Sequence, residues 1–208
     1  MKIFVSGATA THRRFWDDQN FGFLVTPRSG KVQEITETGK AWGVDNEAFG
    51  GWTREKELSF SKLLGRLCEY RPHAELKFVA CPDVVANAAA TRESFDRWGP
   101  IVRTCGMPVG YVFQDGETDV PWDRIDSLFV GGSTEWKLSH ETDTAIEEAK
   151  RLGKWVHVGR VNTLRRMRHF YDIGVDSIDG TTFSRWPDKY FPLALKWLRK
   201  LESQPSIF

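Results

Sequence analysis

Polar residues able to take part in catalysis or recognition recur directly after short apolar runs of this sequence. They include Asp45, Asp83, Gln114, the pair Gly131-Gly132, and Asp179. Three carboxylates and an amide around one cavity suit a ligand with donors and acceptors on one edge, such as guanine. A carboxylate accepts from the N1 and N2 hydrogens of that base, while an amide hydrogen or a glycine N–H donates to O6. Each of these residue types also follows strands because it forms turns, so the inference rests on their joint pattern.

The elements that would position these residues are eight short runs with the pattern of buried parallel strands. The runs are residues 2–6, 22–26, 41–45, 76–81, 109–114, 127–131, 155–159 and 176–179. Amphipathic segments predict helices over residues 54–70, 84–105, 141–152, 163–173 and 189–202. Alternation of strand and helix predicts an α/β fold, with residues 1–208 as a single domain.

A closed barrel explains the polar strand ends best, because the carboxyl ends of all its strands meet at one mouth. The connections around residues 12–20, 28–40 and 120–126 are too short or too rich in turn residues for full helices. We therefore expect a compact (β/α)8 TIM barrel whose outer helix ring is incomplete. An open doubly wound sheet remains the structural alternative.

Composition narrows the class of protein. Lys and Arg number 29 against 28 Asp and Glu, so only local patches can attract a polyanion. The three cysteines are far apart, which favours a reducing compartment and argues against a local zinc site. No signal peptide or membrane span is evident, so we expect a soluble, cytoplasmic protein without metal or cofactor.

In their order along the chain, the strand ends resemble the tRNA-guanine transglycosylase superfamily, the queuine tRNA-ribosyltransferases. Members of this superfamily exchange guanine for a 7-deazaguanine on a (β/α)8 barrel. The resemblance spans about residues 40–185 and is carried by Gly43-Val44-Asp45 with Phe49, Phe78-Val79-Ala80-Cys81-Pro82-Asp83, Tyr111-Val112-Phe113-Gln114-Asp115-Gly116, Val130-Gly131-Gly132-Ser133-Thr134-Glu135, and Gly174-Val175-Asp176-Ser177-Ile178-Asp179 followed by Thr181 and Arg185.

The resemblance implies a role for each matching residue. Asp179 would be the nucleophile that attacks C1′ of the target nucleotide, and Asp45 would be the general acid and base. The residues that would hold the base are Asp83, Gln114, Gly131, Gly132 and Glu135, with Phe49 stacked on its face. Strand alternation places Asp176 on the opposite face from Asp179, so we interpret Asp176 as structural. His157, inside an apolar strand, is interpreted as a core histidine.

Two departures from the family pattern bear on the acceptor. The zinc site and the added segments of the tRNA-acting members are absent, and their Asp-Ser-Gly-Gly turn is Asp45-Asn46-Glu47-Ala48 here. The chain is more similar to the short phage and bacterial members that place 7-deazaguanines such as preQ0 into DNA. We therefore expect exchange in duplex DNA, in the host cytoplasm if the protein is phage-encoded. Transfer to tRNA, or a noncatalytic barrel that binds nucleic acid as a subunit, remain alternatives.

A flipped-out target nucleotide requires phosphate contacts that offset the cost of opening the duplex. Arg160 and Arg185 follow strand ends and are the preferred candidates. Further candidates are His12, Arg13, Arg14 and Arg165. For Arg165, a solvated helix face is an equally good interpretation. Which 7-deazaguanine is used, any target sequence, partner proteins and the oligomeric state stay open.

Overall fold

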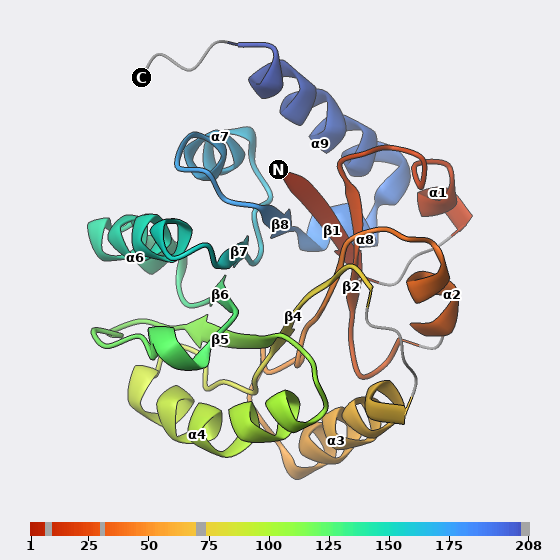
Figure 1. Ribbon diagram of the computed structural model, residues 1–208. Helices are drawn as coiled ribbons and strands as arrows, with labels where there is room; N and C mark the ends of the chain where they lie inside the picture. Colours follow the sequence, from red (N-terminus) through yellow and green to blue (C-terminus); the bar gives the residue numbers. More distant parts are fainter. Residues whose placement is uncertain (7–9, 30–31, 70–73, 205–208) are drawn as a thin grey trace.

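Eight parallel strands close into a barrel in the computed structural model of the protein (Figure 1). The structure describes residues 1–6, 10–29, 32–69 and 74–204. The strands are β1 (Lys2–Ser6), β2 (Phe21–Val25), β3 (Trp42–Val44), β4 (Leu76–Ala80), β5 (Val109–Phe113), β6 (Ser127–Val130), β7 (Trp155–Val158) and β8 (Ser177–Asp179). Each strand pairs with the next, and β8 pairs with β1 through the register Ile3 to Ile178.

Helices of very different length lie outside the barrel (Figure 1). They are α1 (Ala10–Arg13), α2 (Val32–Glu37), α3 (Arg54–Glu69), α4 (Ala88–Thr104), α5 (Thr134–Lys137), α6 (His140–Arg151), α7 (Leu164–Asp172), α8 (Thr181–Arg185) and α9 (Pro187–Glu202), with a 3-10 helix η1 (Trp122–Arg124). Among the residues that the structure describes, the connections β1 to β2, β2 to β3 and β5 to β6 hold only the short elements α1, α2 and η1. Within the described ranges, no helix has both the length and the apolar composition needed to cross a membrane.

The closed barrel confirms the predicted fold class and excludes the open doubly wound sheet. Every predicted strand is present, with ends that differ from the predicted ones by at most one residue. The helix predicted over residues 84–105 begins later, at Ala88. The reason is the cap: the side chain of Asn87 accepts a hydrogen bond from the Ala90 N–H at 3.0 Å, which leaves residues 84–87 as a loop at the barrel mouth.

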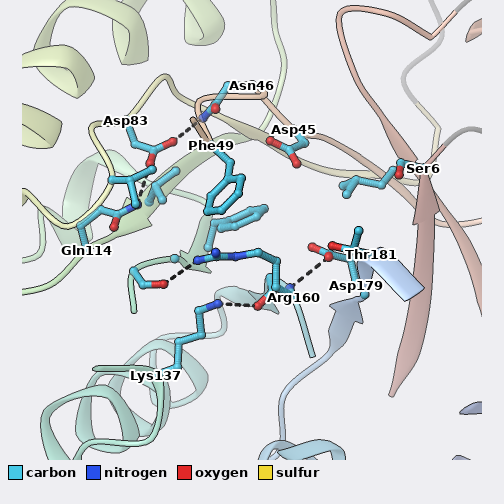
Figure 2. Close-up of a pocket in the computed structure, with 18 of the residues that line it drawn as sticks. Ser6, Asp45, Asn46, Phe49, Asp83, Gln114, Lys137, Arg160, Asp179 and Thr181 are labelled. Carbon is cyan, nitrogen blue, oxygen red and sulfur yellow. Dashed lines mark hydrogen bonds between the residues drawn. The ribbon is translucent and has the colours of Figure 1, made fainter. Parts of the chain in front are cut away.

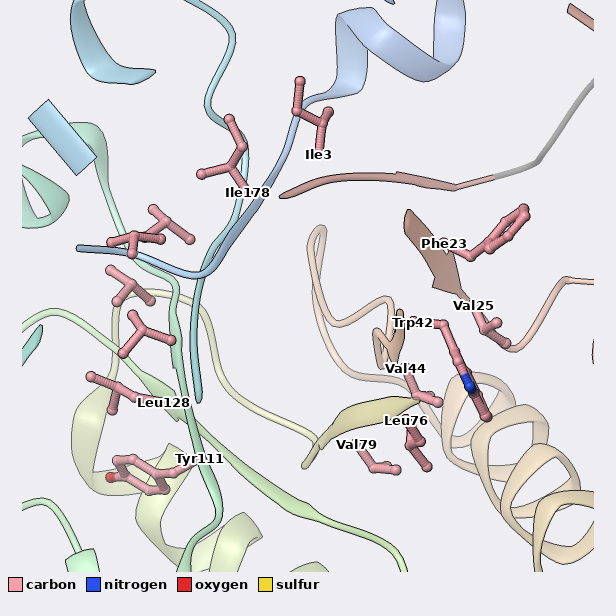
Figure 3. Packing of buried hydrophobic residues seen from close by; sticks show 14 of the residues in the cluster. Ile3, Phe23, Val25, Trp42, Val44, Leu76, Val79, Tyr111, Leu128 and Ile178 are labelled. Atoms are coloured by element: carbon pink, nitrogen blue, oxygen red, sulfur yellow. The ribbon is translucent and has the colours of Figure 1, made fainter. Parts of the chain in front are cut away.

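Alternate residues of the strands point outward and pack beneath the helices (Figure 3). Ile3, Val44, Leu128 and Ile178 are fully buried in this layer. On the outer face of β3, Trp42 is also fully buried, and its Nε1 donates to the Ala74 carbonyl at 3.0 Å. The strands are thus apolar on the outward face and free to carry polar residues on the inward face.

Aromatic rings fill the barrel interior. The ring centroids of Phe4, Phe78 and Phe129 lie 5.5, 4.8 and 4.7 Å from that of His157. Room for these rings comes from a neighbouring glycine: a Cβ added to Gly43 would lie 2.3 Å from the Phe78 ring. The interior below the mouth is therefore a packed floor.

Replacing Gly43 with alanine is expected to lower the free energy of unfolding by about 1–3 kcal/mol, because the added methyl meets the Phe78 ring, which is packed against Phe4, Phe129 and His157. Gly65→Ala is the matched control. Gly65 lies in α3 with nothing within 4 Å of an added Cβ, so this change should be neutral or stabilise the protein by up to about 1 kcal/mol. Urea unfolding of the three proteins measures both effects. Equal stability of Gly43→Ala and the parent would contradict the packed interior.

Candidate functional site

A cavity of about 360 Å³ opens at the carboxyl ends of the strands (Figure 2). Residues in or just after all eight strands contribute to its lining, from Ser6 of β1 to Asp179 of β8. Nine residues singled out in the sequence line it, namely Asp45, Phe49, Asp83, Gln114, Gly131, Gly132, Arg160, Asp179 and Arg185. The barrel therefore brings together residues that are as much as 140 positions apart, from Asp45 to Arg185.

Asp83 is held by two amide side chains on the wall formed by β4 and β5. Its Oδ1 accepts from Asn46 Nδ2 at 2.8 Å, and its Oδ2 accepts from Gln114 Nε2 at 2.6 Å. Gln114 is itself oriented, because its Oε1 accepts from the Ala86 N–H at 3.0 Å. All three side chains are buried, and burial raises the pKa of Asp83 while the two amide donors oppose that shift. A carboxylate with one donor on each oxygen keeps further lone pairs for a ligand.

The loop after β3 consists of two overlapping side-chain turns. Asp45 Oδ1 accepts from the Glu47 N–H at 2.9 Å, and Asn46 Oδ1 accepts from the Ala48 N–H at 2.6 Å. Glu47 has a φ of 58°, which the turn requires. These turns aim Asp45 into the cavity and Asn46 at Asp83, although residues 45–48 include no glycine.

Asp45 is a carboxylic acid poised to hold or release a proton near neutral pH. Burial raises its pKa to about 7, against the opposing effect of the Glu47 N–H. The carboxylates of Asp179 and Asp83 repel its negative form and act in the same direction as burial. Such a group suits general acid and base chemistry.

Asp179 ends β8 and points into the cavity with both oxygens engaged. Oδ1 accepts from the backbone N–H of Arg160 at 3.0 Å, and Oδ2 lies 3.1 Å from His157 Nε2. Arg160 has a φ of 60°, a backbone conformation that is uncommon outside glycine and often found at functional sites. In this turn after β7, Arg160 directs both its backbone N–H and its side chain at the cavity. Asp176 lies outside the cavity and pairs with Lys150 Nζ at 2.6 Å, in agreement with its predicted structural role.

A chain of hydrogen bonds orients the ring of His157 toward Asp179. Trp155 Nε1, which can only donate, lies 2.9 Å from Ser177 Oγ, and Ser177 Oγ lies 2.9 Å from His157 Nδ1. Ser177 accepts from the tryptophan and donates to Nδ1, so Nε2 carries the hydrogen and donates to Asp179. The opposite tautomer would set a lone pair against the carboxylate. His157 is a fully buried core residue, as predicted, and it also contacts the site.

The Gly131-Gly132 pair lets the backbone line the cavity, but only part of the predicted donor pair is available. The Gly131 N–H donates to the Phe113 carbonyl at 3.0 Å, so the expectation that it serves a ligand is wrong. Barrel pairing takes that N–H because Gly131 still continues β6. At Gly132, where φ is 78°, an added Cβ would lie 2.3 Å from Asp115 Oδ2. Both positions exclude larger residues.

Two cations lie on the wall formed by β6 and β7. Lys137 is 6% exposed, and its Nζ donates to the Gly159 carbonyl at 2.8 Å. Arg160 Nη2 donates to the Gly132 carbonyl at 2.6 Å, and its Cζ lies 4.4 Å from the centroid of the Phe49 ring. Phe49 is 67% exposed at the mouth, where it can cover a flat ligand. Arg160 was predicted to contact phosphate, and in the structure its side chain lines the cavity (Figure 2).

The remaining predicted residues lie away from the cavity. Glu135 is exposed on α5 and Arg165 is exposed on α7, and neither lines the cavity. Arg13 pairs with Glu34 at 2.7 Å, and Arg14 lies 3.8 Å from Asp188. His12 is fully buried with Nε2 3.1 Å from the Phe183 carbonyl, so it is not a surface contact for phosphate.

Sequence reasoning assigned no role in the site to Asn46 or Lys137. A signal was present for Asn46, which follows Asp45 directly at a strand end. Lys137 follows the Gly131-Gly132 pair by five residues, a place where a lysine usually faces solvent. Its burial depends on the short helix α5, which places the Lys137 side chain in the cavity wall.

The site can bind a flat polar ring and act on an atom beside Asp179. Leu24, Val112 and Phe129 form its apolar floor, while the carboxylates of Asp45, after β3, and Asp179, in β8, face the same cavity (Figure 2). Among the described residues, no group of three or more His, Cys, Asp or Glu side chains could hold a metal ion. The chain matches no model of a known protein family, and no curated protein is significantly similar to it.

Proposed function

We propose that the protein is a DNA guanine transglycosylase that replaces guanine in duplex DNA by a 7-deazaguanine such as preQ0. The proposed intermediate is covalent, with Asp179 bonded to C1′ of the target nucleotide. The observation that carries this proposal is the pairing of two carboxylates in contrasting surroundings. Asp179 accepts from two donors, whereas burial raises the pKa of Asp45 to about 7. Two acids with such different environments suit a nucleophile and a proton carrier.

The reaction would proceed in two balanced steps. An oxygen of Asp179 bonds to C1′ as the bond from C1′ to N9 breaks, and Asp45 gives its proton to the departing guanine. The 7-deazaguanine then enters, Asp45 takes the proton from its N9, and N9 bonds to C1′ as the ester to Asp179 breaks. The ester at an anomeric carbon is labile, which makes the second step feasible. At the end of the second step Asp45 is protonated and Asp179 is a free carboxylate, as they were at the start.

The wall opposite the nucleophile would read the base. Asp83, fixed by Asn46 and Gln114, accepts from N1 and N2 of guanine. The second hydrogen of Gln114 Nε2 donates to O6. Phe49 covers one face of the ring, and the apolar floor covers the other.

Duplex DNA is the proposed acceptor because of the resemblance to the short, DNA-acting members of the superfamily. The short elements α1, α2 and η1 fit the incomplete outer helix ring that we propose for this compact barrel. Arg185, exposed at the rim of the cavity, would contact phosphate beside the flipped nucleotide, with Arg165 farther out. The proposed setting is the cytoplasm, where the DNA of a bacterium or its phage lies.

The test is incubation with duplex DNA and a panel of 7-deazaguanines, followed by digestion to nucleosides and mass spectrometry. We expect modified deoxynucleoside and free guanine in equal amounts. A parallel reaction with tRNA separates the two acceptors. Absence of exchange with every base in both acceptors, while the protein still binds DNA, would support the noncatalytic alternative and overturn the proposal.

His157→Phe is expected to lower kcat about 10- to 100-fold with little change in KM for DNA or base, because a hydrogen bond to the reacting carboxylate is lost. His157 is a positioning residue, because its imidazole acts on the substrate only through its contact with Asp179. His157→Gln should restore part of kcat, because its amide nitrogen can donate to the same oxygen. Steady-state kinetics of the three proteins test this, and equal losses in both variants would mean that His157 only packs the core.

A further inference from the structure

The two cations on the β6 to β7 wall form no salt bridge in the part of the chain that the structure describes. Lys137 has three donor hydrogens, and one is used on the Gly159 carbonyl. Arg160 is occupied by the Gly132 carbonyl and the Phe49 ring. Neither forms a salt bridge with a carboxylate in the described part of the chain. Lys137 is buried, and a buried charge without a salt bridge is costly, so this wall suits a ligand group that accepts hydrogen bonds.

The charge on Lys137 persists near neutral pH in spite of its burial. Burial lowers its pKa to about 8, and repulsion by Arg160 acts in the same direction. The negative charge of Asp179 opposes both effects. An anion bound beside Lys137 would relieve the desolvated ammonium.

The order of strands around the barrel determines which edge of a bound guanine faces this wall. β4 and β8 lie on opposite sides of the closed barrel. With N9 at Asp179 and the N1 and N2 edge at Asp83, one flank of the ring faces β3 and the other faces β6 and β7. O6 needs donors, and these are Gln114 Nε2, Lys137 and Arg160 rather than the carboxyl of Asp45. C7 is on the same flank as O6, so it faces Lys137 and Arg160.

Glycine backbone, without side chains, forms this flank of the cavity. Gly131, Gly132 and Gly159 all line the cavity there. A Cβ at Gly131 would lie 2.7 Å from Gln114 Nε2, which shows that this wall is already at the limit of its packing. Because glycines carry no side chain, a group on C7 can reach the two cations.

We propose that the incoming base carries a hydrogen-bond acceptor at C7, that a carboxylate is preferred there, and that a cationic aminomethyl group is disfavoured by Lys137 and Arg160. This inference rests on the proposed base exchange and names its substrate class. A carboxylate accepts several charge-assisted hydrogen bonds, a nitrile fewer, and an ammonium none. The expected order of use is therefore 7-carboxy-, then 7-cyano-, then 7-aminomethyl-7-deazaguanine.

The experiment compares four bases with the intact protein and duplex DNA: labelled guanine and the three 7-substituted deazaguanines. Incorporation of labelled guanine reports base exchange alone, because guanine has no substituent at this position. If labelled guanine is not incorporated into the DNA, the proposed function fails. If labelled guanine is incorporated, kcat/KM for the carboxy base should exceed that for the aminomethyl base by about 10- to 100-fold, which is the effect expected from one charge-assisted hydrogen bond. Equal use, or preference for the aminomethyl base, would overturn this inference and leave base exchange intact.

Lys137→Met identifies the residue responsible. We expect the ratio of kcat/KM for the carboxy base to that for guanine to fall about tenfold or more. The matched control is Lys154→Met, because Lys154 Nζ also donates to a backbone carbonyl, that of Ile125 at 2.7 Å, but lies outside the cavity. Its ratio should equal that of the parent. Equal losses for guanine and carboxy base in Lys137→Met would mean that the lysine serves O6, the phosphate or Asp179 and not the C7 group, and would overturn the assignment. If that variant does not fold, the comparison of bases with the parent protein decides.

Discussion

Replacing Asp179 with asparagine is expected to abolish base exchange, with a fall in rate of at least about 10⁴-fold. The amide keeps the size of the side chain and still accepts from the Arg160 N–H, but it cannot form the ester with C1′. Single-turnover release of guanine from duplex DNA measures the rate. A second readout is the adduct: the parent protein should form a complex with DNA that survives denaturation, and the variant should not.

Asp176→Asn is the control for this variant, since it changes a carboxylate three positions away that faces out of the cavity. It should keep the rate and the adduct while losing about 1–3 kcal/mol of stability, because Asp176 accepts from Lys150 and from the Val156 N–H. If Asp179→Asn still formed the covalent complex, another group would be the nucleophile.

Asp45→Asn is expected to slow guanine release about 10²- to 10⁴-fold, the usual contribution of a general acid. In the parent protein the release step needs the protonated acid. Its rate should therefore be constant below pH 7 and fall above it, because the pKa of Asp45 is about 7. The variant should be slow throughout and lack this decline. Single-turnover rates from pH 5.5 to about 9 provide the test.

The same variant should be more stable than the parent at alkaline pH. The folded protein holds the Asp45 proton between its ordinary pKa and about 7, so stability due to this group is lost as pH rises through that window. At pH 8 an ionised carboxylate lies beside two others, and asparagine removes that cost, which we expect to add about 1–3 kcal/mol. The advantage should disappear near pH 4.

Glu47→Gln serves as the matched control for Asp45, since it changes a carboxylate in the same loop that pairs with Arg28 at 3.5 Å. It should keep the decline in rate above pH 7 and show no gain in stability of that size. A decline that survives in Asp45→Asn would assign the proton to a different group.

The sequence by itself determined the eight strands and the carboxylates at their ends, for reasons of local periodicity, while closure of the barrel was shown by the structure. Apolar runs ending in turn residues marked all eight strands, and alternation separated Asp179 from Asp176 before any contact was known. Asp45, Asp83 and Gln114 could be assigned to one mouth because parallel barrel strands all end on the same side. These conclusions need only the order and spacing of residues along each strand.

Only the tertiary structure decided which partners each polar group has, because those partners come from distant segments. The pairing of β7 with β8 brings His157 beside Ser177, and this register makes a core histidine a donor to Asp179. Lys137 resembles a surface lysine in sequence, yet it is buried without a carboxylate partner in the described structure. Arg13, by contrast, is satisfied by Glu34 from a separate helix. Charge compensation depends on three-dimensional neighbours, and periodicity carries no information about them.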